Sequence, residues 1–189
     1  MEEGNTVTKK RKFTWVQGCW SLSCTLMMGA AILAFLKGEA NLADIAVPLG
    51  LAMFFSGWVN MLVYHKQCKI MHGAHWLLAD GMSTALLSIF LLFNQMIEAA
   101  TIPFFFGVWE LFSGVLKSID AKELKTERLA GWKRFSAVGL FEIVSGIAAL
   151  LKPVDDFVGM HIVVAVILFV QACGILFKIM IYPTLVDRD

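Results

Sequence analysis

The chain has 189 residues, of which 58% are apolar and 16% are charged, whereas an average soluble domain has about 45–50% apolar and about 25% charged residues. The mean hydropathy is +0.72. These values exclude a disordered chain, a coiled coil and a secreted disulfide scaffold, and the net charge of +1 gives no support to nucleic-acid binding. An integral membrane protein is the class that remains.

Six apolar segments are long enough, or nearly so, to cross the roughly 30 Å of membrane hydrocarbon. They cover residues 13–36, 42–64, 73–93, 99–119, 132–151 and 157–182. Short breaks separate the first from the second, the third from the fourth and the fifth from the sixth, whereas the other two connections are longer and charged. The pattern predicts an all-α polytopic membrane protein with six transmembrane helices, arranged as three tandem helical hairpins.

The distribution of basic residues predicts the orientation. Fourteen of the sixteen Lys and Arg residues fall on one side of the predicted membrane, and Lys37 and Lys152 fall on the other. The positive-inside rule therefore places both termini in the cytoplasm, with residues 1–12 as a basic tail, 13–182 as the membrane domain and 183–189 as a second tail. The predicted outer turns carry an acidic rim of Glu39, Asp44, Glu98, Asp155 and Asp156. We expect an inner (plasma) membrane protein surrounded by the lipid bilayer.

An internal repeat underlies the three hairpins, at about residues 13–68, 72–126 and 129–182. Gly29, Ser88 and Gly146 each begin a similar apolar pentapeptide near the end of the first helix of a copy. In the second helix, the matching positions are Ser56-Gly57, Ser113-Gly114 and Cys173-Gly174. Because small residues let membrane helices approach closely, we expect Gly29, Gly57, Gly114, Gly146 and Gly174 to lie at helix–helix contacts.

Several motifs of the second and third copies resemble one known family. Residues 76–81 read Trp-Leu-Leu-Ala-Asp-Gly, residues 88–94 read Ser-Ile-Phe-Leu-Leu-Phe-Asn, and residues 106–114 read Phe-Gly-Val-Trp-Glu-Leu-Phe-Ser-Gly. The third copy has Gly-Trp at 131–132 and Gly-Ile-Ala-Ala-Leu-Leu-Lys-Pro at 146–153. The chain resembles the HdeD family of bacterial inner-membrane proteins associated with acid resistance. This resemblance implies a role in acid stress and supplies no catalytic or transport site.

Three carboxyl groups lie inside predicted membrane helices, namely Asp80, Glu110 and Glu142. A charged side chain at the helix centre costs about 2.5–3.5 kcal/mol on insertion scales, so none of the three should face lipid. Lys117 and Lys178 are counted with the basic residues of the cytoplasmic side, so no cation is expected at the depth of these carboxyls. They either form a polar pocket or proton-exchanging cluster open to the cytoplasm, or they hydrogen-bond neighbouring Ser and Thr residues as interhelix glue.

Other candidate sites are weaker. His65, Cys68, His72 and His75 are metal-ligating types without a standard spacing, and His161 could sense acid outside the membrane. The sequence has no phosphate-binding loop and no hydrolase or metalloprotease motif. We therefore expect no metal, no cofactor and no enzymatic activity.

Two functional hypotheses remain open. In the first, the protein is a structural or interaction protein in acid or envelope stress tolerance, with a membrane-protein partner or a second copy of itself. In the second, it is a small transporter or channel that moves protons or a small solute past the three carboxyls. The absence of intramembrane cations and of a broken helix favours the first hypothesis.

Overall fold

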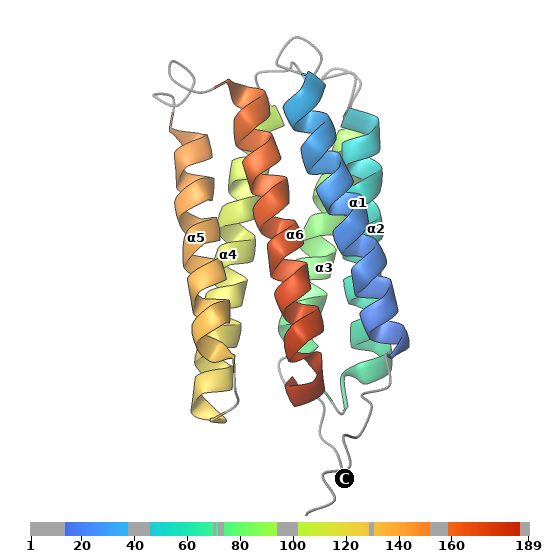
Figure 1. The fold of residues 1–189 in the computed structure, drawn as a ribbon, viewed down its shortest axis with the longest axis vertical. Helices are drawn as coiled ribbons and strands as arrows, with labels where there is room; N and C mark the ends of the chain where they lie inside the picture. The colour runs from blue at the N-terminus through green and yellow to red at the C-terminus, as the bar shows by residue number, and fades with distance from the viewer. Residues whose placement is uncertain are drawn as a thin grey trace, which may run out of the picture.

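The structure is a computed structural model that describes residues 14–37, 46–69, 71, 74–93, 102–128, 131–151 and 159–185. It consists of six long helices that run side by side (Figure 1). They are α1 (Trp15–Lys37), α2 (Ala46–Gln67), α3 (Ala74–Phe93), α4 (Ile102–Thr126), α5 (Trp132–Leu150) and α6 (Met160–Leu185). The predicted all-α fold with six helices is confirmed. The basic tail at 1–12, the acidic rim and Lys152 lie outside the described residues.

The helices form a flattened ring of two layers, with α5, α6 and α1 in front of α4, α3 and α2 in Figure 1. The most extensive contacts join α4 to α5, α2 to α3 and α1 to α6. The helices of each predicted hairpin are also neighbours, but their interfaces are smaller. The repeats are therefore joined mainly by the second helix of one copy packing on the first helix of the next, and the last helix closes the ring on the first.

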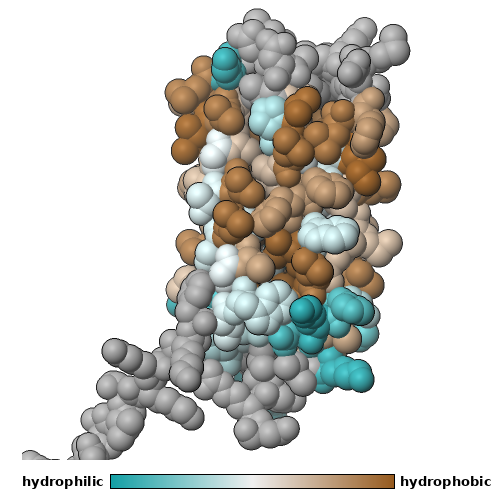
Figure 2. Space-filling model, turned by 90° about the vertical axis from the view of Figure 1, so that its right-hand side faces the viewer, coloured by the Kyte–Doolittle hydropathy of each residue, from teal (hydrophilic) through white to brown (hydrophobic). Residues whose placement is uncertain are grey.

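The outer surface of the bundle is apolar along most of its length. Large side chains such as Leu86 and Phe93 are 72% and 82% exposed, and hydrophilic residues gather at the lower end of the face in Figure 2. Patches of this extent are typical of a surface that contacts lipid. By length and composition, α1, α2, α3 and α6 can each cross a membrane. Helices α4 and α5 run alongside them but carry more charged residues.

Glycines bring two of the three main helix pairs into backbone contact. A Cβ atom on Gly57 of α2 would lie 2.7 Å from the carbonyl oxygen of Gly81 in α3. A Cβ atom on Gly114 of α4 would lie 2.7 Å from the carbonyl oxygen of Gly139 in α5. These two pairs are equivalent in the repeat, since both members are displaced by one repeat length. Close packing of backbones is the usual use of small residues between membrane helices.

Gly146 and Gly29 contrast with each other. A Cβ atom on Gly146 would lie 2.7 Å from the backbone nitrogen of Leu111, so Gly146 belongs to the α4–α5 contact. A Cβ atom on Gly29 would meet no atom within 4 Å. The expectation that Gly29 packs against another helix is therefore not met, because this glycine faces open space.

The third pair, α1 and α6, is held by side chains. Ala30, Ala31 and Ala34 are buried on α1, and the rings of Trp20 and Tyr182 meet edge to face with centroids 5.6 Å apart. Two bonds also reach main-chain oxygens of α6, which accept from Gln17 Nε2 at 3.3 Å and from Cys24 Sγ at 3.3 Å.

The second helix of each repeat turns an equivalent buried stripe toward the interior. The stripes have the same spacing and consist of Met53, Ser56 and Asn60 in α2, Glu110, Ser113 and Lys117 in α4, and Gln171, Gly174 and Lys178 in α6. Residues at i, i+3 and i+7 share one helix face. This register matches Gly174 to Ser56 and Ser113, whereas the sequence pattern alone matches it to Gly57 and Gly114, one residue away.

Candidate functional site: a buried polar network

Charged side chains are buried together where the stripes of α4 and α6 face α3 and α5. Glu110 and Glu142 are 0% exposed, Lys117 is 3%, Lys178 is 6% and Asp80 is 8% exposed. Burial of an ionised group is unfavourable unless it is paired and hydrogen-bonded. Each partner in this cluster therefore matters to the stability of the bundle.

Asp80 of α3 accepts hydrogen bonds from three helices. Its Oδ2 atom accepts from Lys178 Nζ at 2.9 Å and from Asn60 Nδ2 at 3.0 Å. Its Oδ1 atom accepts from Ser113 Oγ at 3.0 Å. The Asn60 carbonyl oxygen in turn accepts from the Trp20 indole at 3.1 Å. The carboxylate of Asp80 is therefore both charge-paired and hydrogen-bonded on both oxygens.

Lys117 of α4 uses all three hydrogens of its ammonium group. It donates to Glu142 Oε1 at 2.5 Å, to Ser113 Oγ at 2.8 Å and to Gln171 Oε1 at 3.1 Å. An ammonium group has three donors and no acceptor, so this set saturates it. Lys117 thereby ties α4 to α5 and to α6.

Glu110 of α4 completes the cluster without touching a cation. Its Oε2 atom accepts from Gln171 Nε2 at 2.8 Å, and its Oε1 atom lies 3.2 Å from Ser145 Oγ. The second oxygen of Glu142, Oε2, is buried and has no hydrogen-bond partner among the described residues. In the described part of the chain, three buried carboxyl groups therefore face two buried ammonium groups, and Glu110 is the carboxyl without an ion-pair partner.

We call this set the polar network. It consists of Trp20, Asn60, Asp80, Glu110, Ser113, Lys117, Glu142, Ser145, Gln171 and Lys178, and it draws on all six helices. Gly174 leaves room for it, since a Cβ atom there would lie 3.3 Å from Lys117 Cε and 3.4 Å from Glu142 Oε1. The missing side chain of Gly174 therefore makes space for the side chains of the network, and it does not bring two helix backbones together.

The structure brings the three carboxyls of the sequence analysis together and corrects their expected surroundings. Lys117 and Lys178 are not surface cations of the basic side, because both are buried and paired with Glu142 and Asp80 at the depth of these carboxyls. Ser113 and Ser145 do contact carboxylate oxygens. The hydroxyls of Ser83 and Thr84 donate to the main-chain oxygen of Asp80 instead.

Charged side chains follow the network along α4 toward one end of the bundle. Along α4 they continue through Asp120 to Glu123, which accepts from the Trp76 indole at 2.8 Å. Thirteen residues separate Glu110 from Glu123, which is about 20 Å of helix. Toward the other end, the buried side chains next to Glu110 are apolar, with Phe106 and Leu168 both 0% exposed.

The histidines are not gathered into a metal site within the described part of the chain. His75 lies beside Tyr64, with ring centroids 5.9 Å apart. His72 and the acidic residues 155 and 156 lie outside the described residues. The Nδ1 atom of His161 is buried without a hydrogen-bond partner there.

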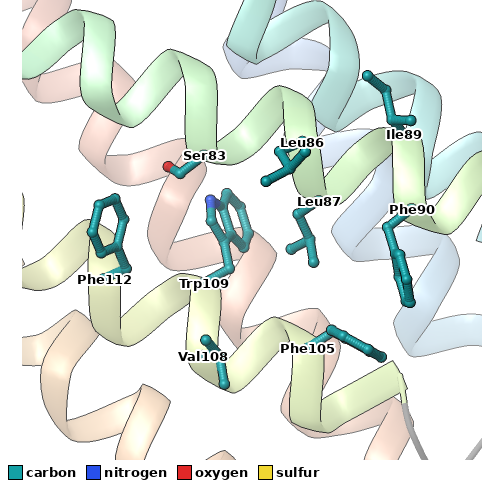
Figure 3. A pocket seen from close by; sticks show the side chains of 9 residues that line it. All are labelled: Ser83, Leu86, Leu87, Ile89, Phe90, Phe105, Val108, Trp109 and Phe112. Atoms are coloured by element: carbon teal, nitrogen blue, oxygen red, sulfur yellow. The ribbon is translucent and has the colours of Figure 1, made fainter.

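A groove of about 560 Å³ lies between α3 and α4. Figure 3 shows aromatic and aliphatic side chains from both helices along it, with Trp109 pointing toward α3. The Trp109 indole donates to Thr84 Oγ1 at 3.0 Å, and the hydroxyl of Ser83 is engaged by the backbone of Asp80. The groove therefore offers an apolar surface with no free catalytic group among its lining residues.

Comparison with known proteins identifies one repeat. Residues 79–151 match the family model described as a short repeat of unknown function, DUF308. This domain is found in HdeD-like membrane proteins. No curated protein and no solved structure matches the chain.

The matched DUF308 segment coincides with the best-packed part of the site. It contains the α4–α5 pair, Gly81 of the α2–α3 contact and all three buried carboxyls. Asn60, Gln171 and Lys178 come from helices outside it. The repeat thus supplies the acidic part of the network, and the flanking helices supply one of its two cations.

Proposed function

We propose that this protein is a non-enzymatic, multi-pass membrane protein of acid or envelope stress tolerance, in which the polar network holds six helices in one arrangement. The resemblance to the HdeD family is the basis for the biological role, and the matched DUF308 repeat of unknown function, which is found in HdeD-like membrane proteins, agrees with that resemblance. In this proposal both termini lie in the cytoplasm, and the surroundings are the inner membrane and either a membrane-protein partner or a second copy.

The observation that carries the proposal is the pairing of the buried charges across helices. Lys178 of α6 pairs with Asp80 of α3, and Lys117 of α4 pairs with Glu142 of α5. Removing one member of a buried ion pair destabilises a protein by about 3–5 kcal/mol, because the other charge is left buried and unpaired. Each pair therefore holds its two helices together only while its carboxyl group is ionised.

Survival of acid-stressed cells tests this function. Cells that lack the protein receive the parent, Lys178→Met, or Lys178→Met combined with Asp80→Asn. We expect the single variant to fail because Asp80 loses its cation, and the double variant to recover part of the survival because no unpaired charge remains. Gly29→Ala serves as the control outside the network. Parental survival with Lys178→Met, at equal protein levels, would contradict the proposal.

Orientation is tested separately with reporters. A reporter fused after residue 189 should be active only if its chemistry works in the cytoplasm, and one inserted at residue 38 only if it works outside. A C-terminus outside the cytoplasm would overturn this part of the proposal.

The polar groups that follow α4 from Glu110 to Glu123 favour transport as a second candidate function. The apolar packing around Phe106 and Leu168 opposes it. The buried hydroxyls of α3 beyond Asp80, on Thr84 and Ser88, donate to main-chain oxygens of their own helix. Proton flux into liposomes that contain the purified protein separates the two candidates. Flux that Glu110→Gln abolishes would establish transport, and absence of flux supports the non-conducting bundle.

A further inference from the structure

Ser145 of α5 lies within hydrogen-bond distance of two oxygen atoms, but its hydroxyl group has only one hydrogen to donate. Its Oγ atom lies 3.1 Å from the main-chain oxygen of Glu142 and 3.2 Å from Glu110 Oε1. A serine hydroxyl is one donor and two acceptors. Within a helix, serine commonly donates to the carbonyl oxygen three or four residues earlier. If the hydroxyl donates to the Glu142 carbonyl, the contact with Glu110 requires a hydrogen on Glu110.

The charges around Glu110 also favour a hydrogen on its carboxyl group. The carboxyl group of Glu142 in α5 acts on it electrostatically. Lys117 lies two turns away on α4, and its three hydrogens are donated to other groups. From α6 the contact is the neutral amide of Gln171. Further along the network, Asp80 of α3 and Lys178 of α6 neutralise each other. One hydrogen ion would therefore bring the whole network to neutrality.

Neither Asp80 nor Glu142 has, among the described residues, a neighbouring atom that could accept a hydrogen bond from a protonated carboxyl. All the hydrogen bonds to the Asp80 carboxylate are donated to it, three in number. Glu142 Oε1 accepts from Lys117, and Glu142 Oε2 has no neighbour in the described structure that could accept a hydrogen. Within the described residues, only a hydrogen on Glu110 Oε1 finds an acceptor, which is Ser145 Oγ.

We propose that Glu110 is a proton-binding site, occupied at neutral pH, with Ser145 as the positioning residue that accepts the bound hydrogen. The ligand is the hydrogen ion itself. The biological meaning of this site rests on the proposed function, whereas its occupancy is a property of the purified protein. Loss of this proton would leave three carboxylates against two ammonium groups in a buried site.

Infrared spectroscopy of the purified full chain in detergent tests the occupancy directly. A protonated buried carboxylic acid has a carbonyl stretching band that an ionised carboxylate lacks. At neutral pH we expect this band in the parent, its loss in Glu110→Gln and its retention in the control Asp120→Asn, which removes a carboxyl of α4 that lies outside the network. A parent band that persists in Glu110→Gln, or one that disappears only in Asp120→Asn, would overturn the assignment.

Ser145→Ala provides a second infrared test in which Glu110 itself is unchanged. Removal of the acceptor should move the carbonyl band to higher frequency, since the acid loses its hydrogen bond, and an unchanged frequency would contradict the role of Ser145. Acid survival of cells that carry Glu110→Gln is scored separately. If Glu110→Gln loses the band but still protects cells fully, the assignment of the proton-binding site stands. The connection of that site to the proposed function is then refuted.

Discussion

The α4–α5 pair and the α1–α6 pair occupy equivalent places in the ring but are held by different contacts. Gly114 and Gly139 let the backbones of α4 and α5 touch, and the ion pair of Lys117 and Glu142 joins the same two helices, each charge three residues after the glycine of its own helix. In the α1–α6 pair, alanines and the edge-to-face rings of Trp20 and Tyr182 fill the interface. The repeated architecture therefore fixes which helices meet, while the chemistry of each contact is free to differ.

Lys117→Met should lower the free energy of unfolding more than any other variant proposed here. It removes the ion pair that joins α4 to α5. It leaves Glu142 buried without a cation and removes the bonds to Ser113 and Gln171. We expect a loss of about 3–5 kcal/mol in the free energy of unfolding, measured by titration of detergent-solubilised protein with a denaturing detergent.

The double variant Lys117→Met with Glu142→Gln is the control for this loss. It should be more stable than Lys117→Met alone, because no unpaired charge remains. Equal stability of the single and double variants would show that the ion pair contributes little to the contact between α4 and α5.

Gly114→Ala tests the backbone contact of the same pair. The added Cβ atom would lie 2.7 Å from the Gly139 carbonyl oxygen and 2.8 Å from the Ile143 nitrogen, both of which belong to the main chain. We expect overpacking to lower the free energy of unfolding by about 1–3 kcal/mol. Gly57→Ala should lose a similar amount at the equivalent α2–α3 contact, and a tolerated alanine at both sites would refute the equivalence.

Trp20→Phe tests the side-chain contact at α1. The variant keeps an aromatic ring against Tyr182 but removes the indole donor to Asn60. We expect a loss of about 1 kcal/mol, since one hydrogen bond between membrane helices contributes roughly that much. A loss as large as that of Lys117→Met would mean that the two pairs depend equally on the polar network.

Gly29→Ala should have the smallest effect, and in the opposite direction. No atom lies within 4 Å of the added Cβ atom, and replacing a helical glycine by alanine stabilises a helix by about 0.5–1 kcal/mol. The thermal midpoint of the purified variant should rise slightly or stay unchanged. A clear fall would indicate a partner for this face, such as a second copy.

The helices themselves were predictable because each coincides with an apolar run that is about long enough to cross the membrane. The predicted segment 73–93 and the helix Ala74–Phe93 differ by one residue. The carboxyls Asp80, Glu110 and Glu142 stood out because they interrupt apolar runs. The cations Lys117 and Lys178 did not stand out, because they lie near the basic connections, where the positive-inside rule assigns them to the cytoplasmic surface.

A sequence signal for these cations exists in the spacing of polar residues. Glu110 and Lys117 are seven residues apart, as are Gln171 and Lys178, and this spacing places each pair on one helix face. The contact of Gly114 with Gly139 carried a weaker signal, since Gly139 is an isolated glycine in an apolar run. Which helix faces which is a property of the closed ring, and no local pattern encodes it.

The separation of Asp80 from its cation has a consequence for how the protein is made. Asn60 precedes Asp80 by 20 residues, but Lys178 follows it by 98. During synthesis the third helix therefore reaches the bilayer with a carboxylate whose amide partner is present and whose cation is still to be translated. The nascent chain must keep Asp80 in a polar setting until the sixth helix arrives, and a chain that stalls before that helix exposes an unpaired charge by which the cell could recognise it as unfinished.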